Sequence, residues 1–265
     1  MRNHFLFPYA GNKRLEVENI YNKIKNNLDD ILVVVEPFVG SASISYFISK
    51  KHPKKFKYIL NDNNEKLIKL YRLMSDDDEK EIKTFEKNVN DIINTFNSFL
   101  NDEQRKQYYL LIKNMDSLES YFFTNKYYNI VPGLYPTFSR LKKIKSFSFN
   151  DYPIYEFLVN EDVEILFDDA TEIYKKYKDI GKSHLIILDP PYLSLNNDFY
   201  ENKSINIYEY LYENNISESK SFILFILENI WIIKLLFKNN FFSEEYDKTY
   251  ERSKSKTKHV IISNF

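Results

Sequence analysis

The sequence predicts an α/β protein built on a mixed sheet with helices on both faces. Short runs of β-branched and aliphatic residues alternate along the chain with segments of helical periodicity, which is the pattern of β-α units. The runs 31–35 and 184–188 are apolar almost throughout, as buried strands are, and a proline-containing turn follows each. Open α/β sheets bind ligands at the carboxyl ends of their strands, so these two turns are the first candidates for a site.

The first part of the chain predicts a β-α-β-α core. A turn at 11–13 precedes a helical pattern, and each of two apolar runs is followed by residues at helical spacing. The expected elements are a helix within 15–24, a strand at 31–35, a helix around 44–48, a strand at 56–60 and a helix around 67–73.

An insertion interrupts this core. Long polar amphipathic patterns run from Asp76 to Asp116, and an aromatic, turn-rich segment follows at 121–149. We therefore expect a mainly helical insertion over residues 76–155 and a core domain formed by residues 1–75 and 156–265. The core resumes with strands expected at 163–167, 184–188, 222–227, 241–250 and 259–265, and with helices at 173–177, near 207–212 and around Trp231.

Composition limits the class of protein. With 265 residues, of which 43% are hydrophobic, the chain can form one large domain or one domain that carries an insertion. Cysteine is absent and the 4 histidines have no metal-binding spacing, so no metal is expected. No signal peptide or membrane span is visible, and the default location is the cytoplasm, including that of a virus-infected cell.

Basic residues are segregated in two segments. The net charge is −1, so any surface for nucleic acid must come from local clustering. One segment, 138–145, carries no acid, and the other, 248–258, carries only Glu251. A solvated charged face is the alternative interpretation of both. The predicted nucleic-acid-binding residues are Arg140, Lys142, Lys143, Lys145, Arg252, Lys254 and Lys256.

The tetrapeptide Asp189-Pro190-Pro191-Tyr192 is the strongest catalytic candidate. Neither proline has an N–H and each fixes its own φ, so the Pro190 carbonyl has a set direction beside the Asp189 carboxylate. Two adjacent acceptors of this kind can bind an amine. Tyr192 adds a flat face that can stack on a planar base. The alternative is a plain Asx-Pro turn.

Three motifs in order carry a resemblance to a known family. They are Phe7-Pro8-Tyr9-Ala10-Gly11-Asn12-Lys13, Glu36-Pro37-Phe38-Val39-Gly40 and Asp189 to Tyr192. The chain resembles the N6-adenine DNA methyltransferases of D12 type, which include bacterial DNA adenine methylase. The resemblance covers residues 4–75 and 160–200, and 258–265 is similar to the last strand of the family. It implies a class I methyltransferase fold, with a Rossmann-like seven-stranded mixed sheet and an inserted helical target-recognition domain.

The same resemblance implies S-adenosylmethionine as the cofactor. Gly40 allows the backbone to approach the cofactor, although a second glycine that many members have in this turn is absent. Asp62 would accept from ribose hydroxyls or cap the following helix. Asp169 would contact the cofactor adenine, with Asp168 as a rival and helix capping as the alternative. The implied cofactor-binding residues are Tyr9, Ala10, Gly11, Lys13, Pro37, Phe38, Gly40, Ser41, Asp62, Asp169 and Asp189.

The implied reaction is methyl transfer to N6 of an adenine in double-stranded DNA. The exocyclic amine is a poor nucleophile, and the Asp189 carboxylate and Pro190 carbonyl would each accept one of its hydrogens and localise the lone pair. The base would be flipped out of the duplex and stacked on Tyr192. Two alternatives remain open: an RNA base methyltransferase, and a catalytically silent methyltransferase fold that binds DNA or serves assembly.

Two segments depart from the family pattern. Residues 127–135 replace the Asn-Arg and Gly-rich stretch of members that read GATC, and Glu228-Asn229 stands where Ser-Asn is frequent. The target sequence is therefore left open. We expect a monomer or weak dimer without membrane association, and a cognate restriction endonuclease is a further expected partner.

Overall fold

A computed structural model of the chain describes residues 4–9, 11–127, 143–191, 209, 218–228, 242–249 and 256–265. The chain divides into two compact units. We call residues 10–68 and 160–265 the sheet unit, and residues 1–9 and 69–159 the insertion unit. The first nine residues thus group with the insertion, whereas the sequence suggested a core domain of 1–75 and 156–265. That domain division stays a prediction.

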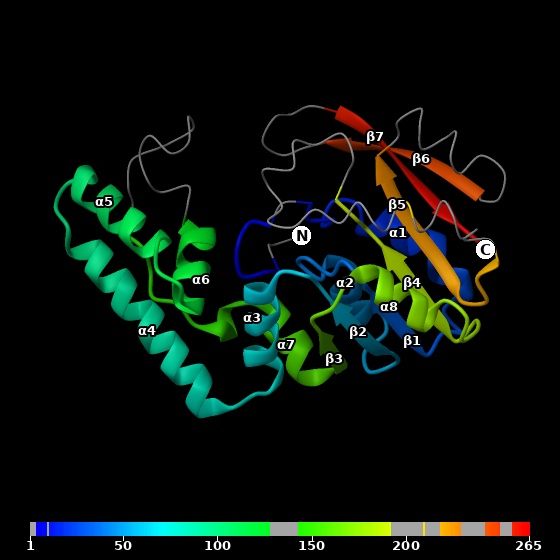
Figure 1. The fold of residues 1–265 in the computed structure, drawn as a ribbon, viewed down its shortest axis with the longest axis horizontal. Helices are drawn as coiled ribbons and strands as arrows, with labels where there is room; N and C mark the ends of the chain where they lie inside the picture. Colours follow the sequence, from blue (N-terminus) through cyan, green and yellow to red (C-terminus); the bar gives the residue numbers. More distant parts are fainter. Residues whose placement is uncertain are drawn as a thin grey trace. The chain divides into compact units, whose positions relative to one another are not determined.

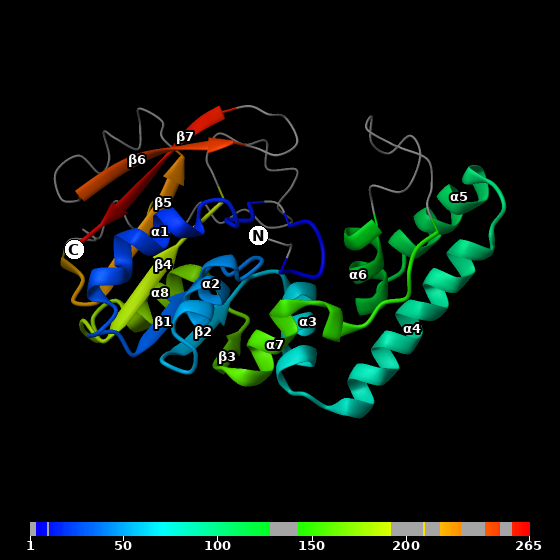
Figure 2. The same cartoon turned by 180° about the vertical axis from the view of Figure 1, so that it is seen from behind.

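The sheet unit is built on one seven-stranded sheet with the strand order β3-β2-β1-β4-β5-β7-β6 (Figure 2). Strands β3, β2, β1, β4 and β5 are parallel, and β7 runs antiparallel to both β5 and β6. The mixed α/β fold that the sequence predicts is confirmed. The strands are β1 Val33–Glu36, β2 Lys57–Asn61, β3 Asp162–Leu166, β4 His184–Leu188, β5 Phe222–Glu228, β6 Phe242–Thr249 and β7 Lys256–Ser263.

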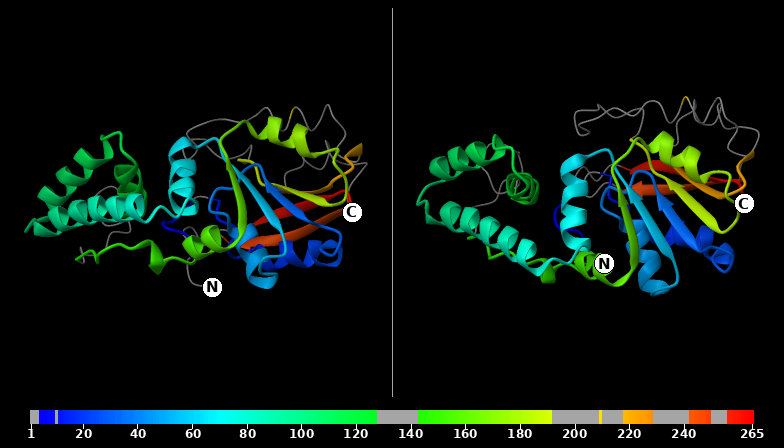
Figure 3. Two further views of the ribbon diagram at one scale, coloured as in Figure 1. Left: turned by 90° about the horizontal axis from the view of Figure 1, so that it is seen from below. Right: turned by 60° about the horizontal axis from the view of Figure 1, so that its bottom comes forward.

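Helices cover both faces of the sheet, as the sequence also predicts. Figure 3 shows α8 (Ala170–Tyr177) on one face and α1 (Val17–Ile24) with α2 (Ser43–Lys51) on the other. A short 3₁₀ turn, Lys25–Asn27, follows α1. The next helix, α3 (Glu65–Ser75), contains the boundary between the units. The expected helices near 207–212 and around Trp231 lie outside the described residues, apart from residue 209.

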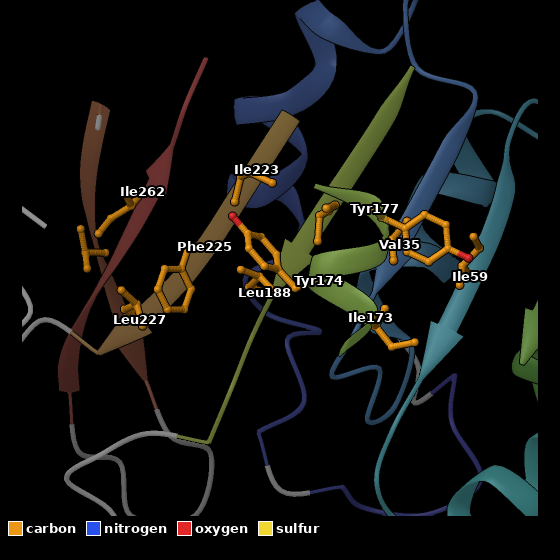
Figure 4. Close-up of a cluster of buried hydrophobic side chains, with 12 residues drawn as sticks. Val35, Ile59, Ile173, Tyr174, Tyr177, Leu188, Ile223, Phe225, Leu227 and Ile262 are labelled. Carbon is orange, nitrogen blue, oxygen red and sulfur yellow. The ribbon is translucent and has the colours of Figure 1, made fainter. Parts of the chain in front are cut away.

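An aliphatic and aromatic core fixes the strands that carry the site. Val35, Ile59 and Ile186 lie side by side on β1, β2 and β4, and all are buried. Tyr174 and Tyr177 of α8 belong to the same cluster (Figure 4). Each fully buried side chain of this size stabilises the fold by roughly 1.5–3 kcal/mol, before the entropy cost of ordering the chain. The ends of these strands are therefore held by a dense core.

The sheet has a topological switch point between β1 and β4. From β1 the chain moves outward through β2 to β3, and it then returns to place β4 on the other side of β1. Connections that leave two adjacent parallel strands in opposite directions open a crevice at the carboxyl ends of those strands, where such sheets bind ligands. Glu36 ends β1 and Asp189 directly follows β4, so both residues lie at this edge.

The insertion unit is mainly helical (Figure 1). Its helices are α4 Glu79–Ser98, α5 Asp102–Lys113, α6 Leu118–Tyr127 and α7 Pro153–Asn160, with a 3₁₀ turn at Phe149–Asp151. The side chain of Asp78 caps α4 and that of Asn101 caps α5. Its core is aromatic: Phe7 meets Phe122 edge to face, and Phe85 stacks on Phe149. Hence the N-terminal segment packs with the insertion.

A polar ladder on α4 binds the extended backbone of residues 144–149. Asn97 accepts from the N–H of Ile144 and donates to its carbonyl, and Asn90 does the same for Phe147. Glu86 accepts from the N–H of Phe149 at 2.7 Å. Side chains four and seven residues apart share one helix face, so this stripe of α4 fixes the segment.

No helix among the described residues could cross a membrane.

Candidate active site

An ion pair joins the first and third sequence motifs. Lys13 Nζ lies 2.5 Å from Asp189 Oδ2, and it donates to the carbonyl of Gly11 at 3.0 Å. The Lys13 side chain is 4% exposed and that of Asp189 is 16% exposed, so little water screens the pair. The ammonium stabilises the negative charge on Asp189, which is the form that accepts hydrogen bonds from an amine.

The loop that carries Lys13 is fixed at both ends. Gly11 has a φ of 78°, a left-handed conformation that glycine adopts without strain. The side-chain oxygen of Asn12 accepts from the N–H of Arg14 and from the hydroxyl of Ser43 at the start of α2. The carbonyl of Lys13 accepts from the N–H groups of Glu16 and Val17, which opens α1. The Lys13 side chain therefore starts from a well-defined backbone.

The turn after β1 is joined to the end of β2. Gly40 has a φ of 47°, and its N–H donates to Asp62 Oδ2 at 3.0 Å. Ala42 also lies in the left-handed region, with a φ of 51°, where glycine would fit without strain. This is the turn for which the sequence resemblance implies a second glycine that the chain lacks. Asp62 Oδ1 accepts from the N–H of Asn64. The cap of α3 is Asn64 and not Asp62, because the Asn64 side-chain oxygen accepts from the N–H of Leu67.

Asp62 combines burial with backbone hydrogen bonds. Burial raises its pKa, and the N–H groups of Gly40, Asn64 and Asn63 act in the opposite direction. A carboxylate offers about four acceptor positions, so these three donors leave room for a hydroxyl group. Its predicted contact with a ribose stays a prediction.

Asp169 and its rival Asp168 lie at the end of β3. The Asp169 carboxylate accepts from the N–H of Thr171 at 2.8 Å and caps α8, as the alternative interpretation expected. Asp168 Oδ1 accepts from the N–H of Asp169. Both aspartates are exposed. A contact of Asp169 with the cofactor adenine stays a prediction.

Asn61 braces three strand ends, although the sequence did not single it out for this role. Its amide donates to the carbonyls of Pro37 and Asp168, at 2.9 and 3.0 Å, and its side-chain oxygen accepts from the N–H of Asp168. The side chain is fully buried. One residue thus ties the end of β2 to the turns after β1 and β3, and an amide directly after a buried strand is the sequence signal for it.

Glu36 is a second residue that sequence reasoning did not assign to the site. It is 2% exposed, and Oε1 accepts from the N–H of Ser45 at 2.8 Å and from its hydroxyl. Burial raises its pKa from 4.5 to about 7, and the charges of Asp189 and Lys13 also act on it. The sequence signal was an acid at the end of a buried strand. Near neutral pH Glu36 is therefore only partly ionised.

The predicted residues fall into three groups. Tyr9 belongs to the insertion unit, where its ring meets Phe5 edge to face. Lys143 and Lys145 are exposed there, and Lys256 pairs with Thr249 at the start of β7. Besides Lys256, the predicted residues described within the sheet unit are Gly11, Lys13, Pro37, Phe38, Gly40, Ser41, Asp62, Asp169, Asp189, Pro190 and Pro191. Those outside the described residues are Ala10, Arg140, Lys142, Tyr192, Arg252 and Lys254.

In the described part of the chain, no group of three or more His, Asp or Glu side chains is arranged to hold a metal ion. The acceptors and the ammonium at the switch point are instead suited to organic ligands that carry amine, hydroxyl and carboxylate groups.

Comparison with known proteins identifies the family to which the sequence is similar. The family model described as D12 class N6 adenine-specific DNA methyltransferase matches residues 9–261. No curated protein matches the sequence significantly. Among solved structures, the chain is similar to one titled "Structure of an Antibiotic Related Methyltransferase", at 12% identity over 92% of each chain and a TM-score of 0.33. A likeness this weak supports no conclusion.

Proposed function

We propose that this chain, which belongs to the D12 class N6 adenine-specific DNA methyltransferase family, takes its methyl group from S-adenosylmethionine and methylates an adenine flipped out of duplex DNA. The family membership makes the chain an adenine methyltransferase. The Lys13–Asp189 ion pair at the switch point is the observation that carries the assignment of the chemistry to this edge of the sheet. An enzyme with this substrate works inside cells.

The residues around the turn after β1 fit the proposed cofactor. Asp62 offers an acceptor for ribose hydroxyls at the end of β2, and Lys13 offers a cation for a carboxylate group. The left-handed turn at Gly40 brings backbone, without a Cβ, to the same edge. S-adenosylmethionine, when bound, supplies a methyl group on an electron-poor sulfonium.

Asp189 and Pro190 would hold the target amine. The Asp189 carboxylate already accepts from one nitrogen donor, the Lys13 ammonium, so its chemistry suits the N6 hydrogens of adenine. The Pro190 carbonyl follows the last residue of β4 by two positions, on a backbone that two prolines restrict. With both hydrogens accepted, the nitrogen lone pair would be withdrawn from conjugation with the ring and would attack the methyl group in line. The C–N bond would form as the sulfonium C–S bond breaks, and the surplus proton on N6 would pass to the Asp189 carboxylate. Tyr192 would stack on the flipped base.

The DNA would be bound through phosphates. Lys145 is exposed on the segment that the α4 ladder fixes, and Lys143 is exposed just before it. Lysines of this kind contribute affinity without reading sequence. We extend this proposal to Arg140, Lys142, Arg252, Lys254 and Lys256. We also propose that the enzyme is a monomer or a weak dimer. A cognate restriction endonuclease is the further partner that we propose.

The test is transfer of labelled methyl to mixed-sequence duplex DNA and, separately, to structured RNA. The wild type should label N6 of adenine in DNA, and Asp189→Ala should abolish the label. Asp179→Ala is the matched control, since its carboxylate pairs with Lys178 at the surface. Label on RNA alone would overturn the DNA assignment, and cofactor binding without any transfer would overturn the enzymatic one.

A further inference from the structure

A buried acid and a buried histidine meet one turn beyond Lys13. Nδ1 of His259 lies 3.2 Å from Oε2 of Glu16, and the two side chains are 0% and 4% exposed. Glu16 precedes α1, and His259 belongs to β7. Neither residue has a part in the chemistry proposed above. The pair nevertheless links strand β7 to the loop that carries Lys13.

Glu16 touches Lys13 directly. The N–H of Glu16 donates to the carbonyl of Lys13 at 2.7 Å, and the N–H of Val17 donates to the same carbonyl at 2.9 Å. The backbone of Glu16 thus closes the turn while its side chain is held by β7. A series of direct contacts therefore runs from His259 through Glu16 and Lys13 to Asp189. It joins β7 to the end of β4, although β5 lies between these strands.

Stability alone is a weak explanation for this pair. A buried pair of ionisable groups is often no more stabilising than apolar side chains of the same volume, because both groups lose their hydration. The pair instead fixes the orientation of the Glu16 side chain, because a carboxylate that is bound to an imidazole can take few other orientations. The orientation of Glu16 matters because this residue adjoins the turn from which the Lys13 side chain reaches Asp189.

We infer that Glu16 and His259 are positioning residues: the buried pair holds the turn at Lys13 so that its ammonium meets the Asp189 carboxylate. Their effect on methyl transfer rests on the function proposed above. A displacement of about 1 Å at a catalytic group can cost about 100-fold in rate. Loss of the pair should therefore lower kcat far more than it changes the KM for DNA.

The first test uses His259→Leu, with Ser221→Ala as the matched control. Ser221 is also buried in the sheet unit, and its hydroxyl donates to the carbonyl of Tyr177, away from Lys13. Both variants lose a buried polar contact. We expect kcat to fall at least about 10-fold in His259→Leu, and to stay at the wild-type value, per folded molecule, in Ser221→Ala. Glu16→Gln keeps an oxygen acceptor for Nδ1 and should retain more activity than Glu16→Leu.

A second measurement does not depend on activity. Lys13 is buried, so a small acylating reagent followed by mass spectrometry should modify it slowly in the wild type and in Ser221→Ala. His259→Leu should increase modification of Lys13 while thermal unfolding confirms a folded protein. Unchanged modification of Lys13, or a fall in kcat that only follows the folded fraction, would overturn the inference. Failure of the wild type to methylate DNA would refute the proposed function, while the modification of Lys13 would still decide the positioning role.

Discussion

Glu36 lies in an environment very different from that of an exposed glutamate, since its side chain is buried. Burial at the end of β1 raises its pKa to about 7, above the ordinary value of 4.5. The folded protein therefore binds a proton more tightly than the unfolded chain does. This contribution to stability is complete below pH 4.5 and is lost as the pH rises through 7. The difference amounts to about 3 kcal/mol, from about 1.4 kcal/mol for each pH unit.

Glu36→Gln should remove this part of the pH dependence. Glutamine keeps an acceptor for the N–H and hydroxyl of Ser45, but it does not titrate. The free energy of unfolding, measured with urea from pH 4.5 to 8, should fall more steeply with pH in the wild type than in the variant. Curves that stay parallel over this window would show that Glu36 does not titrate near neutrality.

Single residues of the site could be predicted from sequence when they sit in a local motif. Gly40 and Asp62 follow directly from strand, turn and acid patterns, and the structure brings their atoms within hydrogen-bond distance. For Asn61 and Glu36 the local pattern marks only a polar residue at a strand end, without a role. Their roles depend on partners that the fold supplies, such as Asp168 for Asn61, and no local pattern encodes such a pairing.

At the scale of elements, the ladder on α4 offers the clearest test. Asn90 satisfies both backbone groups of Phe147, and Phe147 itself is buried. Asn90→Leu would leave that N–H and carbonyl without these partners, at a cost of about 1–3 kcal/mol for each buried group that finds no other. Because Lys145 lies two residues before Phe147, DNA binding should weaken together with the local structure.

Asn88→Leu is the control on the same helix, since Asn88 donates to Glu119 at the surface. Fluorescence anisotropy with duplex DNA at two salt concentrations should show a higher Kd and a smaller salt dependence for Asn90→Leu, and little change for Asn88→Leu. Calorimetry should find the same cofactor affinity in both variants. Equal DNA affinity of the two variants would argue against the role of this segment in binding phosphates.

Elements were easier to predict than their arrangement. The central strands β1, β2, β4 and β5 correspond to apolar runs, because burial on both faces leaves little room for polar residues, whereas the edge strand β6 is mostly polar. The strand order comes from contacts between distant segments, and no local pattern of the sequence encodes it. The packing of Phe5 and Phe7 is not visible in any local pattern, because their aromatic partners, Tyr71 and Phe122, lie far along the chain.

At the scale of the whole molecule, the two units have separate cores, so a destabilising substitution in one core should mainly affect the unit that contains it. Phe122 is fully buried in the insertion unit, and Ile186 is fully buried in the sheet unit. Phe122→Ala should cost about 3–5 kcal/mol and Ile186→Ala about 2–5 kcal/mol. We expect hydrogen exchange to accelerate mainly in α4–α6 for the first variant and mainly in β1, β2 and β4 for the second. Equal acceleration in both units would mean that they unfold as one.

The position of β1 in the sheet has a consequence for synthesis. Val35 pairs with Ile186 of β4, and residues 69–159 of the insertion unit are translated between these two residues. The apolar run of β1 therefore leaves the ribosome long before its neighbour exists, whereas α4 and α5 can form from local contacts at once. Pairings between distant segments are slow to form and leave strand edges exposed in the meantime. The nascent chain should thus depend on holding chaperones until β4 has emerged, and slower translation before β4 would lengthen that exposure.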